Sequence, residues 1–160
     1  MTEPLLIMRH GEAGWGSPDP ARELTARGAD EAARMGTWLA GRDDLALDRL
    51  RLLASPYRRA QQTAERLGEA LGLSVETLER ITPDDSPEAV VEWLLAQDGD
   101  RPLLLVSHMP LVGGLTGLLV DGRADRGPGF PTAAIAELDA EVPAAGCARL
   151  TRFTAPADLV

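Results

Sequence analysis

The sequence predicts an α/β fold: a single domain over residues 1–160, built on an open, mostly parallel sheet with helices on both faces. Three observations predict it. Apolar runs of strand length alternate with longer segments whose apolar residues recur at helical spacing. A chain of 160 residues with 44% hydrophobic content suits one globular core. No internal repeat or low-complexity segment interrupts the alternation.

The first half of the chain predicts three strands and two helices. Thr25 is expected to cap the first helix and Gly41 to stop it, and the second helix is expected to open near Pro56 and end at Gly72. In chain order the expected elements are strand 4–8 (PLLIM), helix 24–41 (LTARGADEAARMGTWLAG), strand 50–55 (LRLLAS), helix 56–72 (PYRRAQQTAERLGEALG) and strand 74–78 (SVETL).

The second half continues the alternation after a polar loop, residues 79–87 (ERITPDDSP). The last two strands are expected to pair as a hairpin across VPAAG, so the sheet is expected to be parallel up to that point. The expected elements are helix 88–97 (EAVVEWLLAQ), strand 102–108 (PLLLVSH), helix 110–120 (PLVGGLTGLLV), the turn-rich loop 123–132, and strands 133–141 (AAIAELDAE) and 147–153 (CARLTRF).

Composition narrows the range of functions. The formal charge of −9 argues against broad binding to nucleic acid or anionic membranes, because both require an extended basic surface. The apolar runs are shorter than a membrane span, the N-terminus lacks the basic region of a secretory signal, and Cys147 is the only cysteine. We therefore expect a cytoplasmic monomer. All 16 cationic side chains are arginines, so an anion site must use arginine, histidine and backbone donors.

Polar residues follow three of the expected strands where each apolar run stops. They are Arg9 with His10, Ser55 with Arg58 and Arg59 just beyond, and Ser107 with His108. In open α/β sheets the ligand site lies beyond the carboxyl ends of the strands, so these groups can converge on one crevice. Loops and helix starts follow each of them, and their backbone amides favour an anion there.

Each of these motifs also has a structural interpretation when taken alone. An Arg-His pair at a strand end is more often a surface or hydrogen-bonded pair than a catalytic one. SPYRR by itself could be a helix start with two solvated arginines, and His108 could be a buried histidine with satisfied hydrogen bonds. The chain has no HExxH or CxxC motif, so we expect neither a metal site nor another cofactor.

Taken together, the motifs are more specific. The segments LLIMRHGEA, RELTARG, SPYRRAQQTA and LLLVSHMPLVGGL, followed by FPTAAIAEL and PADL, resemble the histidine phosphatase superfamily and, within it, the small SixA-type phosphohistidine phosphatases. The resemblance covers nearly the whole chain and implies a phosphoglycerate-mutase-like fold. It implies that His10 is the nucleophile. The phosphate pocket would be completed by Arg9, Arg59 and His108.

The same resemblance distinguishes the neighbouring arginines. Arg59 occupies the arginine position of the family pattern SP..RA..T, whereas Arg58 does not match it. Arg22 precedes LTARG and matches a family arginine on the pocket rim. The residues that the resemblance implies as substrate-binding are Gly11, Arg22 and Ser55.

The chemistry explains these residue types. Attack on phosphorus requires a neutral His10, and two adjacent guanidinium groups are expected to disfavour its protonation. Arginine binds phosphoryl oxygens with a planar fork of donors and stabilises the charge that spreads over them in the transition state. A covalent phosphohistidine divides one hard displacement into two easier ones. Arg9, Arg59 and, if cationic, His108 would supply the positive charge that a metal otherwise brings.

A general acid is the uncertain part of the pattern. Larger members of the superfamily place an acidic residue after the third strand, together with insertions that cover the pocket. Here the available carboxylates are Glu12, Asp84 and Asp85, and for each of them a solvated loop residue is the favoured interpretation. An imidazole leaving group needs little acid assistance, and an open site admits a phosphohistidine that projects from a protein.

We therefore expect a metal-independent phosphohistidine phosphatase that acts on a protein. The alternatives are a small-molecule phosphomonoesterase of the same superfamily and a non-catalytic phosphoprotein-binding module. A mutase is less expected, because no covering insertion is present to retain an intermediate.

Overall fold

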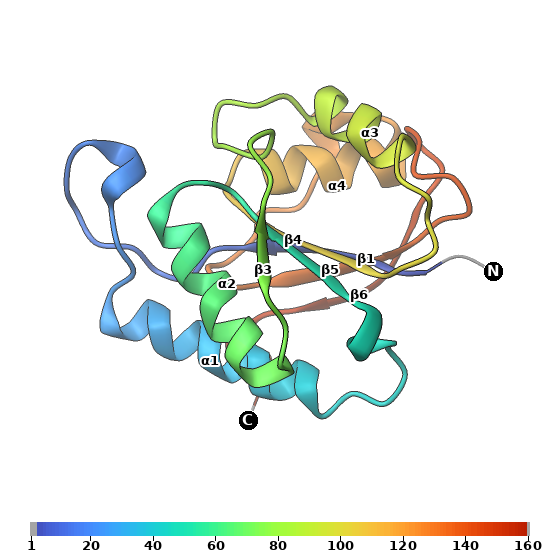
Figure 1. The fold of residues 1–160 in the computed structure, drawn as a ribbon. Coiled ribbons are helices and arrows are strands. Elements are labelled where there is room, and N and C mark those ends of the chain that lie inside the picture. The colour runs from blue at the N-terminus through green and yellow to red at the C-terminus, as the bar shows by residue number, and fades with distance from the viewer. Residues whose placement is uncertain (1–2, 160) are drawn as a thin grey trace.

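The computed structural model describes residues 3–159, and in that part of the chain six strands form one sheet with helices on both faces (Figure 1). The strands are β1 (Leu5–Arg9), β2 (Arg51–Ala54), β3 (Val75–Thr77), β4 (Leu103–Ser107), β5 (Ile135–Asp139) and β6 (Arg149–Thr154). The helices are α1 (Ala26–Ala40), α2 (Arg58–Leu71), α3 (Pro87–Leu95) and α4 (Leu111–Asp121).

The strand order in space is β3-β2-β4-β1-β5-β6. The first four strands of the chain run parallel to one another, whereas β5 pairs antiparallel with β1 and β6 pairs antiparallel with β5. The predicted α/β class with a mostly parallel sheet is confirmed, and so is the final hairpin.

Local signals in the sequence account for most of the element boundaries. Thr25 caps α1, since its hydroxyl accepts a hydrogen bond from the N–H of Gly28 at 3.0 Å, and Gly41 ends the helix as predicted. The second helix begins at Arg58, two residues later than the predicted Pro56. Four short 3₁₀ turns were not predicted. They lie at Asp19–Ala21, Leu47–Arg49, Ala124–Arg126 and Pro156–Asp158.

The central strands are apolar on both faces because helices cover both. Along β1, Leu6 and Met8 pack into the layer under α1 and α2, whereas Ile7 packs into the layer under α3 and α4. All three side chains have no exposed area. This two-sided burial explains why the run PLLIM is continuously apolar instead of alternating.

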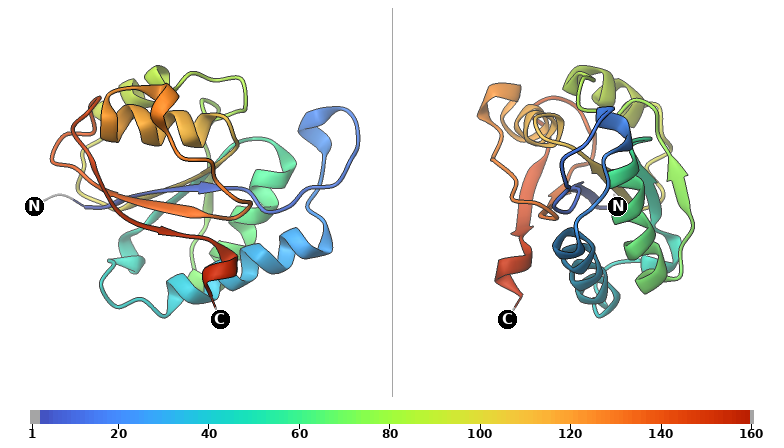
Figure 2. Two further views of the ribbon diagram at one scale, coloured as in Figure 1. Left: turned by 180° about the vertical axis from the view of Figure 1, so that it is seen from behind. Right: turned by 90° about the vertical axis from the view of Figure 1, so that its left-hand side faces the viewer.

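A loop projects from the sheet at the end where the parallel strands stop. The parallel strands end near the segment that joins β1 to α1, and this segment projects from the body of the molecule at the side opposite the N-terminus (Figures 1 and 2). Its stem is a bridge between Ala13 and Leu24, with the N–H of Gly14 donating to the carbonyl of Glu23 at 2.9 Å. We refer to residues 13–24 as the rim loop.

No helix within residues 3–159 is long and apolar enough to cross a membrane.

Candidate active site

His10 lies one residue beyond the end of β1, at the carboxyl end of the sheet. Its backbone N–H donates to the carbonyl of Ser107 at 3.0 Å, so the pairing with β4 extends to this residue. The side chain is buried, and its Nδ1 lies 2.7 Å from the carbonyl oxygen of Gly11. Because a carbonyl oxygen only accepts hydrogen bonds, Nδ1 carries the proton and Nε2 presents a lone pair.

Glycine is required on both sides of the backbone that follows His10. A Cβ atom on Gly11 would lie 2.5 Å from the carbonyl oxygen of Gly28, and one on Gly28 would lie 2.0 Å from the carbonyl oxygen of Glu12. The first turn of α1 therefore packs directly against the RHG segment. The N–H of Gly11 donates to Thr63 Oγ1 on α2 at 3.1 Å, which fixes the same backbone from a second helix.

Arg59 and Arg58 are adjacent at the start of α2 but face different surroundings. Arg59 is 5% exposed, and its Nε donates to Nε2 of His10 at 3.3 Å. Arg58 is exposed and pairs with Glu23 on the rim loop. The register taken from SPYRRAQQTA therefore places Arg59, and not Arg58, against His10.

Arg9 supplies a second guanidinium group at the end of β1. Its Nη1 donates to the carbonyl of Phe130 at 2.7 Å, while its buried Nε has no hydrogen-bond partner. Burial lowers the pKa of Arg9, and the carboxylate of Glu31 opposes that shift.

His108 follows β4 and stands beside His10. The two imidazole rings have centroids 5.0 Å apart in an edge-to-face arrangement, and Tyr57 lies against His108 at the same separation. His108 Nε2 lies 2.7 Å from Ser55 Oγ, and that oxygen accepts a hydrogen bond from the N–H of Tyr57 at 3.3 Å. The buried Nδ1 of His108 has no partner.

Burial keeps both histidines neutral. It is the main cause that lowers the pKa of His10 to about 4, and the Arg59, Arg9 and Arg22 charges add to it against the opposing hydrogen bond to Gly11. The pKa of His108 falls to about 3 for the same main reason. The predicted neutral form of His10 is thus supported, although desolvation contributes more than the arginine charges on which the prediction depended. A cationic His108 is not supported.

The remaining predicted residues lie outside this cluster. Arg22 is on the rim as expected, where Nε donates to the carbonyl of Gly14 at 2.8 Å and Nη1 donates to Asp19 at 3.0 Å. Glu12 accepts from the Thr25 hydroxyl at 2.8 Å, beside the cap of α1. Asp85 accepts from the backbone and hydroxyl of one threonine within its own loop, and Asp84 is exposed. In residues 3–159, no hydrogen bond joins these three carboxylates to His10 or His108.

The sequence reasoning missed two carboxylates beside the cluster. Glu31 is buried in α1 and accepts from the N–H of Glu12 at 2.9 Å and from the Thr132 hydroxyl at 2.9 Å. Asp19 contacts Arg59 from the rim loop. Glu31 could have been found, because it lies at helical spacing among the buried residues of α1, where a carboxylate is unexpected. No local pattern marks Asp19.

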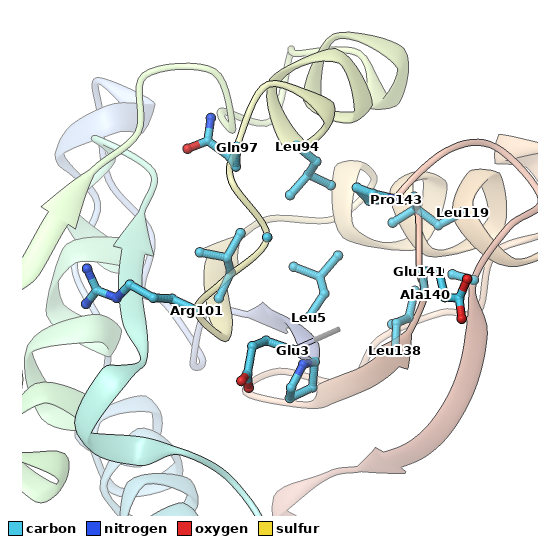
Figure 3. A pocket seen from close by; sticks show the side chains of 14 residues that line it. Glu3, Leu5, Leu94, Gln97, Arg101, Leu119, Leu138, Ala140, Glu141 and Pro143 are labelled. Carbon is cyan, nitrogen blue, oxygen red and sulfur yellow. The ribbon is translucent and has the colours of Figure 1, made fainter. Parts of the chain in front are cut away.

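A cavity of about 70 Å³ lies at the other end of the sheet (Figure 3). Its lining is largely apolar and includes Leu5, Leu94, Leu119 and Leu138, while the guanidinium group of Arg101 points away from it. Neither histidine lines it. The groups suited to phosphoryl chemistry are therefore gathered at the carboxyl end of the strands.

Comparisons with known proteins agree with this arrangement. The model of the histidine phosphatase superfamily (branch 1) matches residues 5–82. The phosphohistidine phosphatase SixA of Escherichia coli is 39% identical over 139 residues, which cover 84% of this chain and 83% of that protein. A SixA homolog of Haemophilus influenzae is 38% identical over 128 residues, covering 74% of this chain and 78% of its own length. The solved structure of the protein histidine phosphatase SixA complexed with tungstate has a TM-score of 0.86 and 35% identity, covering 98% of this chain and 99% of that one.

Proposed function

The chain belongs to the histidine phosphatase superfamily, and from this premise we propose that it hydrolyses phosphohistidine on a protein through a phosphoryl intermediate on His10. Two relatives of high coverage are named phosphohistidine phosphatases. The pocket has the groups that such a reaction needs, since His10 is a neutral imidazole whose Nε2 lone pair accepts a hydrogen bond from Arg59 Nε, and cationic and neutral donors surround it.

The observation that carries this proposal is a pair of unsatisfied buried atoms. Among the buried side-chain nitrogen and oxygen atoms of residues 3–159, Arg9 Nε and His108 Nδ1 lack a hydrogen-bond partner. Leaving such a group unpaired costs about 1–3 kcal/mol, so it is usually avoided. Phosphoryl oxygens on Nε2 of His10 would accept from both atoms. The Ser55 hydroxyl would then donate to Nε2 of His108, which leaves the proton on Nδ1.

The reaction proceeds in two displacements. In the first, the Nε2 lone pair of His10 bonds to phosphorus while the nitrogen–phosphorus bond of the substrate breaks; the departing imidazole keeps that electron pair and takes a proton from solvent. In the second, water bonds to phosphorus as the bond to His10 breaks, and inorganic phosphate forms with release of a proton. Arg59 Nε, which donates to Nε2 of His10, is placed to stabilise the phosphoryl oxygens in both steps.

We propose that no divalent cation takes part, because Arg9 and Arg59 supply permanent positive charge beside the reacting atoms. Within the described residues, no group of three or more His, Cys, Asp or Glu side chains is arranged to hold a metal ion. Turnover should therefore survive exhaustive dialysis against EDTA. Loss of activity that added zinc, manganese or magnesium restores would refute this.

We also propose that the chain is one domain without a lid and acts as a cytoplasmic monomer. The connection between β3 and α3 is only residues 78–86, so it provides little to cover the pocket. A pocket without a lid would suit a phosphohistidine that projects from a folded protein. Light scattering and cell fractionation would test the oligomeric state and the compartment.

The deciding experiment compares turnover of a phosphohistidine-bearing protein with that of p-nitrophenyl phosphate, using a His10→Ala variant as the blank. We expect the phosphohistidine protein to be the far better substrate. A preference for the ester would favour a small-molecule phosphomonoesterase. Binding without release of phosphate from either compound would favour a phosphoprotein-binding module.

A further inference from the structure

Asp19 is the residue of the rim loop that reaches the catalytic arginine. Its carbonyl oxygen accepts from Arg59 Nη1 at 2.8 Å, and its Oδ2 accepts from Arg59 Nη2 at 3.2 Å. Its other carboxylate oxygen accepts from Arg22 Nη1 at 3.0 Å. Asp19 itself is half exposed, whereas Arg59 is buried. The carboxylate therefore approaches the pocket from its solvent side.

These contacts divide the donors of Arg59 into an inner and an outer set. The inner donor, Nε, faces His10, while both terminal nitrogens are bound by Asp19. Arg9 Nε and His108 Nδ1, by contrast, have no partner. An incoming phosphoryl group can thus bond to Arg9 and His108 without displacing anything, but it meets a carboxylate at the outer edge of Arg59.

Resting on the proposed function, we infer that Asp19 is an internal competitor for Arg59 that weakens the binding of free phosphate dianions and so speeds the release of the product. A carboxylate and a phosphate share the same chemistry toward guanidinium, since both accept from its fork of donors. Hydrogen bonds from Arg22 and then Arg59 lower the pKa of Asp19, so the carboxylate is negative at neutral pH.

The carboxylate of Asp19 destabilises bound inorganic phosphate more than it destabilises the transition state. Inorganic phosphate carries close to two negative charges at neutral pH, and the carboxylate repels all of that charge. In a loose transition state the transferring group is metaphosphate-like, with less charge to repel. Asp19 therefore penalises bound phosphate more than the transition state, which is the condition for weaker product binding without a matching loss of rate.

Glu23 offers a matched control for this inference. It lies on the same rim loop and pairs with the exposed Arg58, so Glu23→Gln removes the same charge without touching the pocket. Asp19→Asn keeps the carbonyl contact to Arg59 and replaces the charged contacts of the side chain to Arg59 and Arg22 by neutral ones. The affinity for inorganic phosphate should be measured by titration calorimetry on both variants and the original protein, without substrate and at one ionic strength.

We expect Asp19→Asn to bind inorganic phosphate roughly three- to tenfold more tightly, the range that a partly screened charge pair supports, and Glu23→Gln to stay within about twofold. Product inhibition of turnover should tighten by the same factor. Weaker or unchanged phosphate binding in Asp19→Asn would overturn the inference, because Asp19 would then only position Arg59 or contribute nothing. The titration needs no phosphohistidine turnover, so failure of the proposed function would show separately, as an original protein that binds phosphate but hydrolyses no phosphohistidine.

Discussion

The two ends of the sheet treat charged side chains in opposite ways. At the carboxyl end, His108 is buried and Arg9 is partly buried, and each has one buried nitrogen without a hydrogen-bond partner. At the amino end, Arg49 pairs with Glu3 at 3.3 Å, Arg101 donates to the carbonyl of Arg49 at 2.7 Å, and the cavity beside them is largely apolar. Among the buried side-chain nitrogen and oxygen atoms of residues 3–159, those without a partner lie at the carboxyl end. The difference indicates that the carboxyl end gives up stability to hold donors ready for a ligand.

The largest expected effect is at the carboxyl end. His10→Ala should abolish turnover, because the proposed covalent intermediate forms on Nε2 of His10. The fold should remain intact, since the residue lies beyond the strand and the substitution keeps the backbone hydrogen bond to Ser107. Labelled phosphate trapped on the protein without acid quenching should be absent from the variant. Near-normal activity would show that His10 is not the nucleophile.

The next largest effect is expected at Arg59, and the adjacent Arg58 should show almost none. Removing a donor that meets transition-state charge typically costs roughly 10²- to 10³-fold in rate, so Arg59→Ala should lose that much. Arg58→Ala should change the rate only slightly, because its guanidinium is exposed and pairs with Glu23. Parallel measurements of kcat and KM on one substrate test this. Equal losses in the two variants would contradict the assignment of Arg59 to the pocket.

A core substitution at the amino end should lower the stability of the fold and leave the rate unchanged. Leu138 is 1% exposed on β5 and lines the apolar cavity, so Leu138→Ala should lower the free energy of unfolding by about 2–5 kcal/mol. Activity per folded molecule should not change. Leu150→Ala is the control, since this residue pairs with Leu138 across β5 and β6 but is 38% exposed. Urea denaturation and assays at matched folded fractions would measure both. A large loss of kcat in Leu138→Ala would mean that the two ends are coupled.

The buried histidines should make the stability depend on pH in a defined window. Unfolded histidine titrates near pH 6.5, whereas the folded pKa values of His10 and His108 are about 4 and about 3. Between these limits the unfolded chain binds protons that the folded chain refuses, so the free energy of unfolding falls as the pH falls below about 6.5. At pH 5 the loss should be on the order of 1–2 kcal/mol per histidine.

Urea denaturation at pH 7 and pH 5 measures this loss. Both values lie above the range in which most carboxylates titrate, so the histidines dominate the difference. His10→Ala should show a smaller loss between the two pH values than the original protein. If the two proteins lose the same stability, His10 is not held neutral by burial.

Periodicity and turn residues predicted the sheet, its four helices and the end of the sheet at which His10, Arg59 and His108 gather. They succeeded for β1, β2 and β4 because each of these strands is apolar over its buried length and is followed by polar residues at its carboxyl end, as in the step from Met8 to Arg9 and His10. The start of α2 was misplaced because Tyr57 caps it without a side-chain hydrogen bond, so no capping signal marks that position.

The contact between Asp19 and Arg59 lay beyond such reasoning for a physical reason. It joins residues 40 positions apart, and it depends on the path of the rim loop, which is set by backbone bonds such as that from Gly14 to Glu23. Likewise, the extent to which burial lowers the pKa of His10 depends on how the side chains pack around it. A sequence shows which charges are near in the chain, but not how much water is excluded from around them.

The smallest effect is expected for Glu12, Asp84 and Asp85, the three carboxylates that the sequence offers as general acids. Glu12 bonds to the Thr25 hydroxyl and Asp85 closes its own loop, so both already have structural partners, and Asp84 is exposed. Because general acid help is worth roughly 10²-fold or more where it is needed, and a departing imidazole needs little, Glu12→Gln, Asp84→Asn and Asp85→Asn should each keep phosphohistidine turnover within about tenfold. Assays of the three variants on phosphohistidine and on an alkyl phosphate ester would separate the cases, since a carboxylate that protonates an alkoxide should matter more for the ester. A variant that loses both activities equally would show that the pocket uses a general acid, and the small-molecule phosphatase would then become the better description of this protein.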